Sequence, residues 1–284
     1  MAEININEYL SSAISRLKLR RIGCEMDGLI PFVEMQNGLI FYGSQVSLNG
    51  EKLSPGLQNR TMNQKIEERI LVEIVQIIQD IEFRYLSKRD ISQHSRYTYK
   101  QGDVVVELGA YLGYYAMHIA QQIGPSGRVI AVEFIPDNYR ILKMNLQSNF
   151  PDNSLAINKG VYSKKGYKTA YNGHHQLCSF REDVISQYTS SIDSVEVETD
   201  TVDNILHEND IDKVDLMIIQ INGSEIEALE GMSNSLKSIR NFTIAAPYNK
   251  NGANHISVIS DLLHKNDFDV DVDNIMIFAR NRNL

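Results

Sequence analysis

The sequence has little cysteine and no long apolar run. Its 284 residues include two cysteines, Cys24 and Cys178, which cannot build a disulfide framework and suggest a reducing compartment. No segment approaches the roughly 18 apolar residues of a membrane span, so we expect no transmembrane helix. The opening residues, MAEININEYLSS, carry acids and asparagines where a signal peptide has positive charge and then an apolar stretch. These absences predict a cytoplasmic protein.

Positive charge is also scarce. The chain has 28 Lys and Arg against 36 Asp and Glu, a formal net charge of −8. Because nucleic-acid binding needs a basic surface that neutralises phosphates, we expect no nucleic-acid partner. The short basic run RLKLRR, residues 16–21, is the one hint of such a surface. Residues 190–234 hold twelve acids and one lysine, which we interpret as solvated helix faces and strand ends rather than a metal site.

The first 97 residues differ in pattern from the rest. We expect a helix over residues 7–21, a hairpin at Asn37-Gly38 and an amphipathic helix over residues 63–86. The length of the chain is at the upper limit for one core, so one large domain with an appendage is expected. We interpret residues 1–97 as a helix and hairpin extension that serves as a lid, a docking surface or an oligomer contact. A homodimer through this extension is one alternative.

From residue 98 onward, strands and helices alternate. Such alternation predicts an α/β fold in which a mostly parallel, doubly wound sheet has helices on both faces. Residues 160–200 interrupt it as a β-like insertion, and FDVDV and IMIFAR close the chain as an antiparallel hairpin. The expected strands are residues 103–108, 128–133, 154–158, 214–221 and 242–246, and the expected helices are residues 112–123, 136–147, 200–209, 224–237 and 255–264.

The most informative stretch is Glu107-Leu-Gly109-Ala110-Tyr111-Leu-Gly113, between the first core strand and its helix. Glycine lets the backbone turn tightly and approach a ligand closely. Glu133 ends the next strand, 24 residues after Gly109. A carboxylate at that place can accept both hydroxyls of a ribose, so these two strands predict a nucleoside-binding half-sheet at the carboxyl ends of the strands. The plain alternative is a tight turn with an incidental acid.

The spacing of the motif favours one nucleoside over another. Dinucleotide sites use G-x-G-x-x-G, where pyrophosphate meets bare backbone N–H groups at a helix N-terminus. Here the order is E-x-G-x-x-x-G, and Glu107 would place a negative charge near any phosphate. S-adenosylmethionine has an adenosine, an ammonium, a sulfonium and no phosphate, so it suits this motif. A nicotinamide-dependent oxidoreductase would share the ribose acid but not the glycine spacing.

The run YKQGDVVVELGAYLGYYAMHIAQQIGPSGRVIAVEFIPDNYRILKMNLQSN resembles the core of the FkbM-type S-adenosylmethionine-dependent methyltransferases. The resemblance resumes at VDLMIIQINGSEIEALEGM and covers about residues 98–284. It implies the Rossmann-like class I methyltransferase sheet, with seven strands and a reversed last strand. By this resemblance Glu133 and Phe134 would hold ribose and adenine, Asn138 is a further candidate or a plain helix residue, and the methionine part would be lined by Glu107, Gly109, Ala110, Tyr111 and Gly113.

One strand departs from the family pattern. The family usually has K-I-D-V-E-G-A-E, where this chain has Ile218-Ile-Gln220-Ile-Asn222-Gly-Ser-Glu225. Two acids have become the amides Gln220 and Asn222, which we keep among the cofactor-binding residues. Amides still form hydrogen bonds, but they cannot act as general bases or hold a divalent cation well. A cofactor-binding protein without transfer activity therefore stays open as an alternative.

The resemblance implies methyl transfer to a small-molecule hydroxyl, on a sugar or a lipid-linked precursor. A hydroxyl acceptor benefits from a general base. The candidates are Glu225, Tyr248, His174 and His175. Glu225 is alternatively a first-turn helix acid favoured by the helix dipole, and the two histidines, after Asn172-Gly173, are alternatively solvated hairpin residues. The run HHQLC lacks a fourth ligand for a closed zinc site, so we predict no metal.

Overall fold

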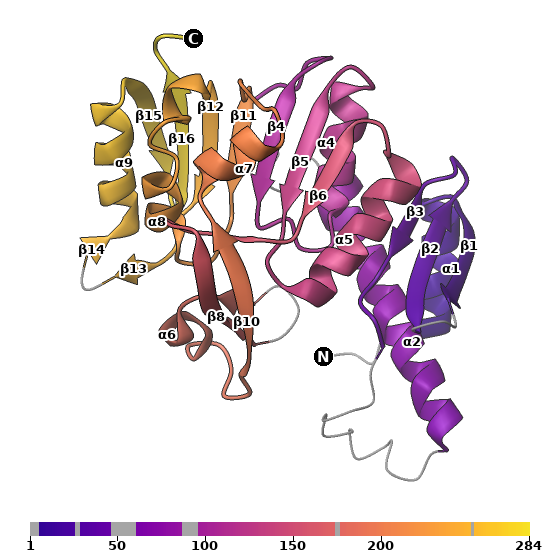
Figure 1. Cartoon of the computed structure of the whole chain (residues 1–284). Coiled ribbons are helices and arrows are strands. Elements are labelled where there is room, and N and C mark those ends of the chain that lie inside the picture. The colour runs from indigo at the N-terminus through magenta and orange to yellow at the C-terminus, as the bar shows by residue number, and fades with distance from the viewer. Residues whose placement is uncertain (1–5, 26–28, 47–60, 87–95, 174–176, 251–252) are drawn as a thin grey trace.

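The centre of the molecule is a seven-stranded sheet (Figure 1). The computed structural model describes residues 6–25, 29–46, 61–86, 96–173, 177–250 and 253–284. Pairing gives the strand order β15-β16-β12-β11-β4-β5-β6, in which only β16 runs against its neighbours. The strands are β4 (Val104–Leu108), β5 (Arg128–Val132), β6 (Ser154–Ile157), β11 (Leu216–Ile219), β12 (Asn241–Ala245), β15 (Phe268–Asp273) and β16 (Met276–Asn281). The predicted α/β sheet with its terminal hairpin is confirmed.

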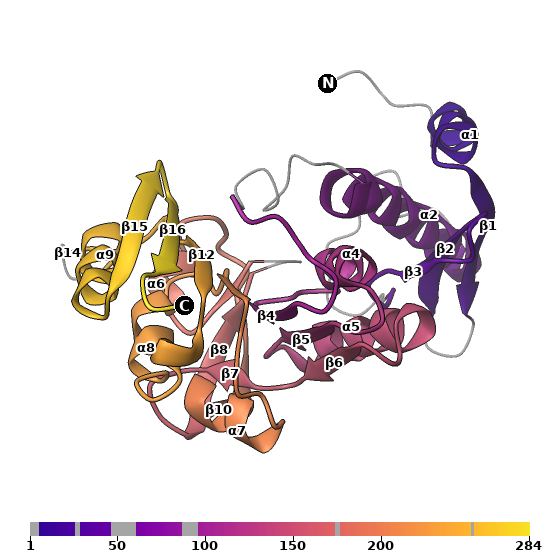
Figure 2. The same ribbon diagram turned by 90° about the horizontal axis from the view of Figure 1, so that it is seen from above.

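Helices cover both faces of the sheet, and Figure 2 shows α4 and α7 on opposite sides of it. In β4, Val105 packs with α4 (Tyr114–Ile123) and α5 (Pro136–Asn149), whereas Val106 packs with the other helices. This alternation follows from the two-residue period of a strand, and it explains why β4 is apolar on both faces. The helices of the second face are α7 (Val202–Glu208), α8 (Glu225–Glu230) and α9 (His255–Lys265).

The N-terminal residues form a small sheet and two helices. The elements are α1 (Ile6–Arg16), β1 (Leu19–Glu25), β2 (Ile30–Met35), β3 (Ile40–Tyr42) and α2 (Met62–Asp80), followed by a π-helical turn, Ile81–Leu86. The hairpin at Asn37-Gly38 forms as predicted, since β2 pairs with β3. The predicted helix over residues 7–21 is wrong at its end, because the backbone reverses at Lys18, whose φ is +53°. Arg20 and Arg21 lie in β1 and pair with Glu34, at 3.2 and 3.0 Å.

Two asparagines attach this N-terminal part to α5, a helix that covers the main sheet. On α5, the Asn145 side chain accepts from the Tyr42 N–H at 2.7 Å and donates to the Tyr42 carbonyl at 3.1 Å. One turn later, Asn149 makes the same pair of bonds with Ile40, both at 2.8 Å. The open edge of β3 is thus satisfied by side-chain amides. Phe41, in the same strand, packs its ring edge-on against Tyr114 at 5.4 Å, so both parts share one apolar core.

Residues 160–200 form a second, four-stranded sheet beside the main one (Figure 1). Its order is β7-β10-β8-β9, and its elements are β7 (Gly160–Val161), β8 (Gly166–Asn172), β9 (Cys178–Ser179), β10 (Asp193–Asp200) and the short α6 (Glu182–Ile185). None of the helices in the described ranges combines the length and the apolar composition that crossing a membrane requires.

Two predicted elements are shorter than expected. The strand predicted over residues 214–221 covers Leu216–Ile219, and Asn222 and Gly223 in the loop after it turn the chain with φ of +51° and +100°. The helix predicted over residues 224–237 ends at Glu230, next to Gly231, and a 3₁₀ turn, Leu236–Ser238, follows it. The first difference lengthens the loop between β11 and α8. That loop lies at the carboxyl edge of the sheet.

Candidate functional site

A cavity of about 300 Å³ lies at the carboxyl ends of the central strands. The chain passes from β4 to β5 on one side, while β11 flanks β4 on the other, so this is the topological switch point where open α/β sheets bind ligands. Its lining comes from the strand ends, the N-terminal part and the insertion: Arg84, Gly109, Tyr111, Glu133, Phe134, Asn138, Cys178, Gln220, Ile221, Asn222, Ala245 and Pro247.

Gly109 lets the chain leave the end of β4 between the neighbouring strands β11 and β5. Its φ is +90°, and a Cβ there would lie 2.0 Å from the Gln220 carbonyl oxygen. On the other side, the N–H groups of Gly109 and Ala110 both donate to the Val132 carbonyl, at 2.9 and 3.0 Å. A side chain at this position would force the ends of β4 and β11 apart. The backbone cradle over this gap therefore depends on glycine.

Glu133 is the carboxylate of the cavity, and its side chain is held by the main chain. Oε2 accepts from the Tyr111 N–H and Oε1 from the Ile135 N–H, both at 2.9 Å. The Asn138 side chain and the Phe134 N–H add further hydrogen bonds. Burial raises the pKa of Glu133 to about 7, although these hydrogen bonds lower it. The donors hold the carboxylate in one orientation at the cavity wall.

Tyr111 connects this carboxylate to a cation. Its backbone, with φ of +52°, turns the N–H toward Glu133, and its ring packs under Arg84, whose guanidinium carbon lies 5.9 Å from the ring centroid. Arg84 belongs to the π-helical turn Ile81–Leu86, and its Nε donates to Asp80 at 3.4 Å. The cavity wall thus combines a motif residue with one from the N-terminal part.

Gln220 and Asn222 line the cavity on the side of β11. The Asn222 Nδ2 donates to the Cys178 carbonyl at 3.0 Å, and the Ser179 hydroxyl donates to the Asn222 carbonyl at 2.6 Å. These two bonds tie β9 of the insertion to the loop after β11. A carboxylate in place of the Asn222 amide could not donate to that carbonyl, so the amide has a structural use here.

Other predicted residues lie around the cavity rather than in its lining. Glu107 is buried within β4, and Ala110 is buried in the turn. Gly113 caps α4 with φ of +83°, and a Cβ there would lie 2.4 Å from Leu142 on α5. Phe134, by contrast, lines the cavity and packs against Phe180 of the insertion, with ring centroids 5.0 Å apart. The predicted cofactor-binding residues therefore include some that line the cavity and others that are buried behind its lining.

The predicted general bases have different surroundings. Glu225 is fully buried, accepts the Gly223 N–H at 2.8 Å and contacts Nδ1 of buried His255 at 3.2 Å, so it supports the loop behind the cavity. Tyr248 follows the lining residue Pro247 and hydrogen-bonds Tyr188; burial and this contact raise its pKa. His174 and His175 lie outside the described residues. No three His, Cys, Asp or Glu side chains gather as metal ligands in the ranges described.

Sequence reasoning missed five lining residues, which are Arg84, Cys178, Ile221, Ala245 and Pro247. Pro247 had a usable signal, since it lies two residues after β12 and the carboxyl ends of parallel strands share one edge. Cys178 comes from the insertion; burial and the nearby Glu133 charge raise its pKa to about 12, so the thiol is un-ionised at neutral pH. Arg84 had no signal, because its place depends on how the N-terminal part packs.

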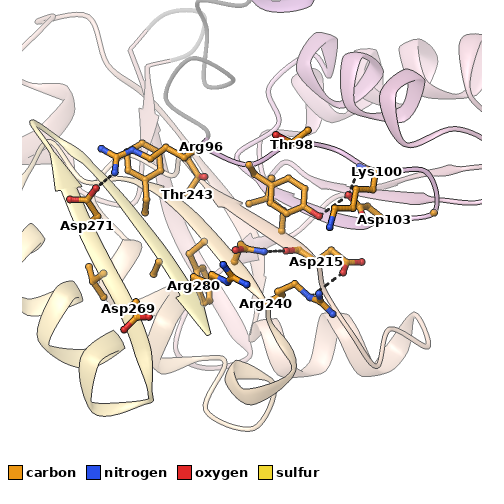
Figure 3. Close-up of a pocket in the computed structure, with 18 of the residues that line it drawn as sticks. Arg96, Thr98, Lys100, Asp103, Asp215, Arg240, Thr243, Asp269, Asp271 and Arg280 are labelled. Atoms are coloured by element: carbon orange, nitrogen blue, oxygen red, sulfur yellow. Dashed lines mark hydrogen bonds and ion pairs between the residues drawn. The ribbon is translucent and has the colours of Figure 1, made fainter. Parts of the chain in front are cut away.

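A larger cavity of about 830 Å³ lies at the opposite edge, where β4, β11 and β12 begin (Figure 3). Its charged side chains largely satisfy one another: Arg96 pairs with Asp271, Arg240 contacts Asp215 at 3.6 Å, and Asp103 accepts from the Tyr97 hydroxyl at 2.7 Å. None of the residues predicted from the sequence motif lines it.

The family model of the methyltransferase FkbM domain matches residues 107–276, more than half of the chain, and no curated protein matches by sequence. Among solved structures, the methyltransferase FkbM from Methylobacillus flagellatus KT shares 14% identity over 78% of this chain and 56% of that one, with a TM-score of 0.47. Aeropyrum pernix fibrillarin with natively bound S-adenosyl-L-methionine shares 14% identity over 93% and 99%, with a TM-score of 0.44.

Proposed function

The chain belongs to the FkbM methyltransferase family, and we propose that it binds S-adenosylmethionine in the cavity between Gly109 and Glu133 and transfers the methyl group to a small-molecule hydroxyl. The observation that carries the proposal is the Glu133 carboxylate. It is 4% exposed, it lines the cavity, and its orientation is fixed by main-chain donors. A carboxylate that ends this strand can accept both hydroxyls of a ribose.

Several features favour this cofactor over a dinucleotide. A pyrophosphate site needs bare N–H groups at a helix N-terminus, whereas here the Tyr111 N–H already donates to Glu133. The cavity of about 300 Å³ is at the small end of ligand pockets, which disfavours two joined nucleotides. Gly109 lines the cavity where β4 ends, and any side chain there would collide with the Gln220 carbonyl oxygen. These residues fit S-adenosylmethionine.

The bound cofactor supplies a methyl group on a sulfonium, which is a good leaving group. The chain has to align the acceptor oxygen with that methyl group, and such alignment alone can supply an effective molarity on the order of 10⁵ M. We propose that Glu133 and Phe134 hold the adenosine while Gln220 and Asn222 flank the methionine part. Glu225 acts as a support for the loop after β11, since it is fully enclosed.

The acceptor proton needs a group that can take it as the oxygen–carbon bond forms. Tyr248 is neutral at physiological pH because its pKa is raised, so we propose that it orients the acceptor hydroxyl instead. His174 or His175 is the proposed base, since the histidine pKa lies near neutrality. The acceptor, a sugar or lipid-linked precursor, would enter between the insertion of residues 160–200 and Pro247. We place the reaction in the cytoplasm, in keeping with two free cysteines.

The domain boundary is part of the same proposal. Residues 98–284 would form the methyltransferase domain, and residues 1–97 an extension that covers the cavity from the side of Arg84. A homodimer through this extension remains a prediction.

The proposal is tested by a thermal-shift screen of S-adenosylmethionine, S-adenosylhomocysteine and NAD. A ligand at 100 times its dissociation constant stabilises the fold by roughly 2.7 kcal/mol. We expect both adenosyl ligands to raise the melting temperature of the wild type, and Glu133→Ala to abolish the rise. Stabilisation by NAD alone would contradict the proposal.

A second candidate function is cofactor binding without transfer, which the amides Gln220 and Asn222 favour because the family usually has acids there. Incubation of the protein with methyl-labelled S-adenosylmethionine and fractionated cell extract separates the two. Label in an extract component supports transfer. Binding of the cofactor with no labelled component in any fraction supports the second candidate.

A further inference from the structure

Among the described residues that line the cavity, two carry a charged side chain. Of these twelve residues, Glu133 is the acid and Arg84 the base. The lining tyrosine and cysteine stay neutral, because burial raises the pKa of Tyr111 and of Cys178. The positions where the family has acids are amides here, Gln220 and Asn222. A ligand in this cavity therefore meets one carboxylate and one guanidinium.

Arg84 is held in place by its neighbours in the π-helical turn. Ile81 and Tyr85 are buried, and the Tyr85 ring packs edge-on against Phe41 at 5.0 Å while its hydroxyl donates to Gln121 of α4 at 2.6 Å. The Arg84 side chain is 18% exposed and contacts Asp80 through Nε. A guanidinium has five N–H donors in a planar fork, so it can contact more than one acceptor group at the same time. π-Helical turns occur frequently at functional sites.

We infer that Arg84 binds the carboxylate at the amino-acid end of the cofactor. This inference rests on the proposed function, because the ribose on Glu133 fixes which part of the ligand is left to be recognised. That part is an aminobutyrate chain with one carboxylate, and Arg84 is the one cation that the described lining offers it. Arginine forms paired, charge-assisted hydrogen bonds with carboxylates.

Tyr111 gives this recognition its geometry. Its N–H fixes Glu133 at 2.9 Å, and its ring supports the Arg84 guanidinium, so one residue sets the position of both charged groups. A cofactor that spans them is oriented along the carboxyl ends of β4 and β11. Arg84 lies outside residues 107–276, so this contact is a contribution of the N-terminal part and not of the matched family domain. It makes the N-terminal part a component of the cofactor site.

The test is calorimetric titration of the full chain with three ligands. S-adenosylhomocysteine has the carboxylate, decarboxylated S-adenosylhomocysteine lacks only that group, and 5′-methylthioadenosine lacks both carboxylate and ammonium. For Arg84→Gln we expect the affinity for S-adenosylhomocysteine to fall about 10- to 100-fold, the range for a lost charge-assisted hydrogen bond. The affinities for the other two ligands should stay within about twofold of wild type.

Two further variants keep the result interpretable. Lys143→Gln, on the exposed side of α5, removes the same charge away from the cavity and should leave all three affinities unchanged. Arg84→Lys keeps the charge and loses the planar fork, so its affinity for S-adenosylhomocysteine should lie between those of the wild type and Arg84→Gln. If Arg84→Gln does not fold, the loss of affinity in Arg84→Lys still tests the inference.

The outcomes separate this inference from the function on which it rests. If the wild type binds S-adenosylhomocysteine and both Arg84 variants bind it equally well, the inference is wrong and the proposed function stands. An equal loss for all three ligands means that Arg84 only shapes the cavity, and a raised acceptor KM with unchanged cofactor affinity assigns Arg84 to the acceptor; each overturns the inference. A wild type that binds none of the three ligands overturns both.

Discussion

Glu133 is the residue on which the account depends most. Its carboxylate is enclosed, yet each of its oxygens already accepts one main-chain N–H, at 2.9 Å. Burial outweighs these donors and raises its pKa to about 7. The group therefore changes charge within the physiological range, and only the ionised form offers acceptors to both ribose hydroxyls.

A pH dependence of nucleoside binding follows. Because the pKa of Glu133 lies above its ordinary value, the binding-competent carboxylate is lost as pH falls through about 7. We expect the affinity for 5′-methylthioadenosine to fall roughly tenfold from pH 8 to pH 6. That ligand has no carboxylate or amine to titrate, so the change reports the protein. Calorimetry checks it, with circular dichroism as the folding control; equal affinity at both pH values would contradict the assignment.

Gly109 is tested against a glycine of the same conformation. Both Gly109 and Gly38 have φ near +90°, but a Cβ at Gly38 meets nothing within 4 Å, whereas one at Gly109 lies 2.0 Å from the Gln220 oxygen. Gly38→Ala should lower the free energy of unfolding by about 1–2 kcal/mol, from backbone strain alone. Gly109→Ala should cost about 1–3 kcal/mol more and abolish S-adenosylhomocysteine binding. Equal costs in urea denaturation would mean that close approach is unimportant.

The sequence located most of the cavity wall because of one geometric rule. Parallel strands end at the same edge, so Gly109, Glu133 and Gln220, which follow three different strands, had to meet. Arg84 and Cys178 could not be found in this way, since neither follows a strand of the main sheet. Their positions depend on packing between segments that are far apart in the chain.

At the scale of elements, turn chemistry decided where strands and helices end. The sequence pattern gave no sign that Lys18 would adopt φ of +53° and convert the end of a helix into β1. Asn222, with φ of +51°, turns the chain in the loop after β11, and its amide ties this loop to β9 of the insertion.

The hydrogen bond from the Asn222 side chain to the Cys178 carbonyl predicts the effect of an acid at position 222, where the family usually has one. Asn222→Asp removes the donor to the Cys178 carbonyl, 3.0 Å away, and sets a carboxylate against it. We expect the free energy of unfolding to fall by about 1–3 kcal/mol and the amides of Cys178 and Ser179 to exchange faster with solvent. Asn266→Asp removes a similar bond, to the Leu262 carbonyl, on the exposed surface and should cost less than about 1 kcal/mol. Equal costs would show that the tie is not structural.

At the scale of the whole molecule, the N-terminal part packs against α4 and α5, the helices that cover one face of the main sheet, and shares their apolar core. Phe41 packs between Tyr85 and Tyr114, at 5.0 and 5.4 Å, and belongs to the core that contains α4. The doubly wound sheet was predictable from alternation, which is local in sequence. The attachment was not, since Asn145 and Tyr42 are 103 positions apart.

Asn145 is the residue that tests this attachment. It is fully buried and satisfies both the N–H and the carbonyl of Tyr42. Asn145→Ala leaves those groups without partners, so the free energy of unfolding should fall by about 2–4 kcal/mol. Gln147→Ala, on the exposed side of the same helix, should change it by less than about 0.5 kcal/mol. Chemical denaturation of both variants decides; a cost for Asn145→Ala as small as that of the control would contradict the attachment.

Two cavities of the described structure lie at opposite edges of the sheet, and the central claim assigns the cofactor to the smaller of these two. A crystal structure of the full chain with S-adenosylhomocysteine tests this claim most directly. The account predicts both ribose hydroxyls about 3 Å from the Glu133 carboxylate oxygens, with the methionine part beside Gln220 and Asn222. A nucleoside bound in the larger cavity, near Arg240 and Arg280, or one that leaves Glu133 without a ribose contact, would contradict it.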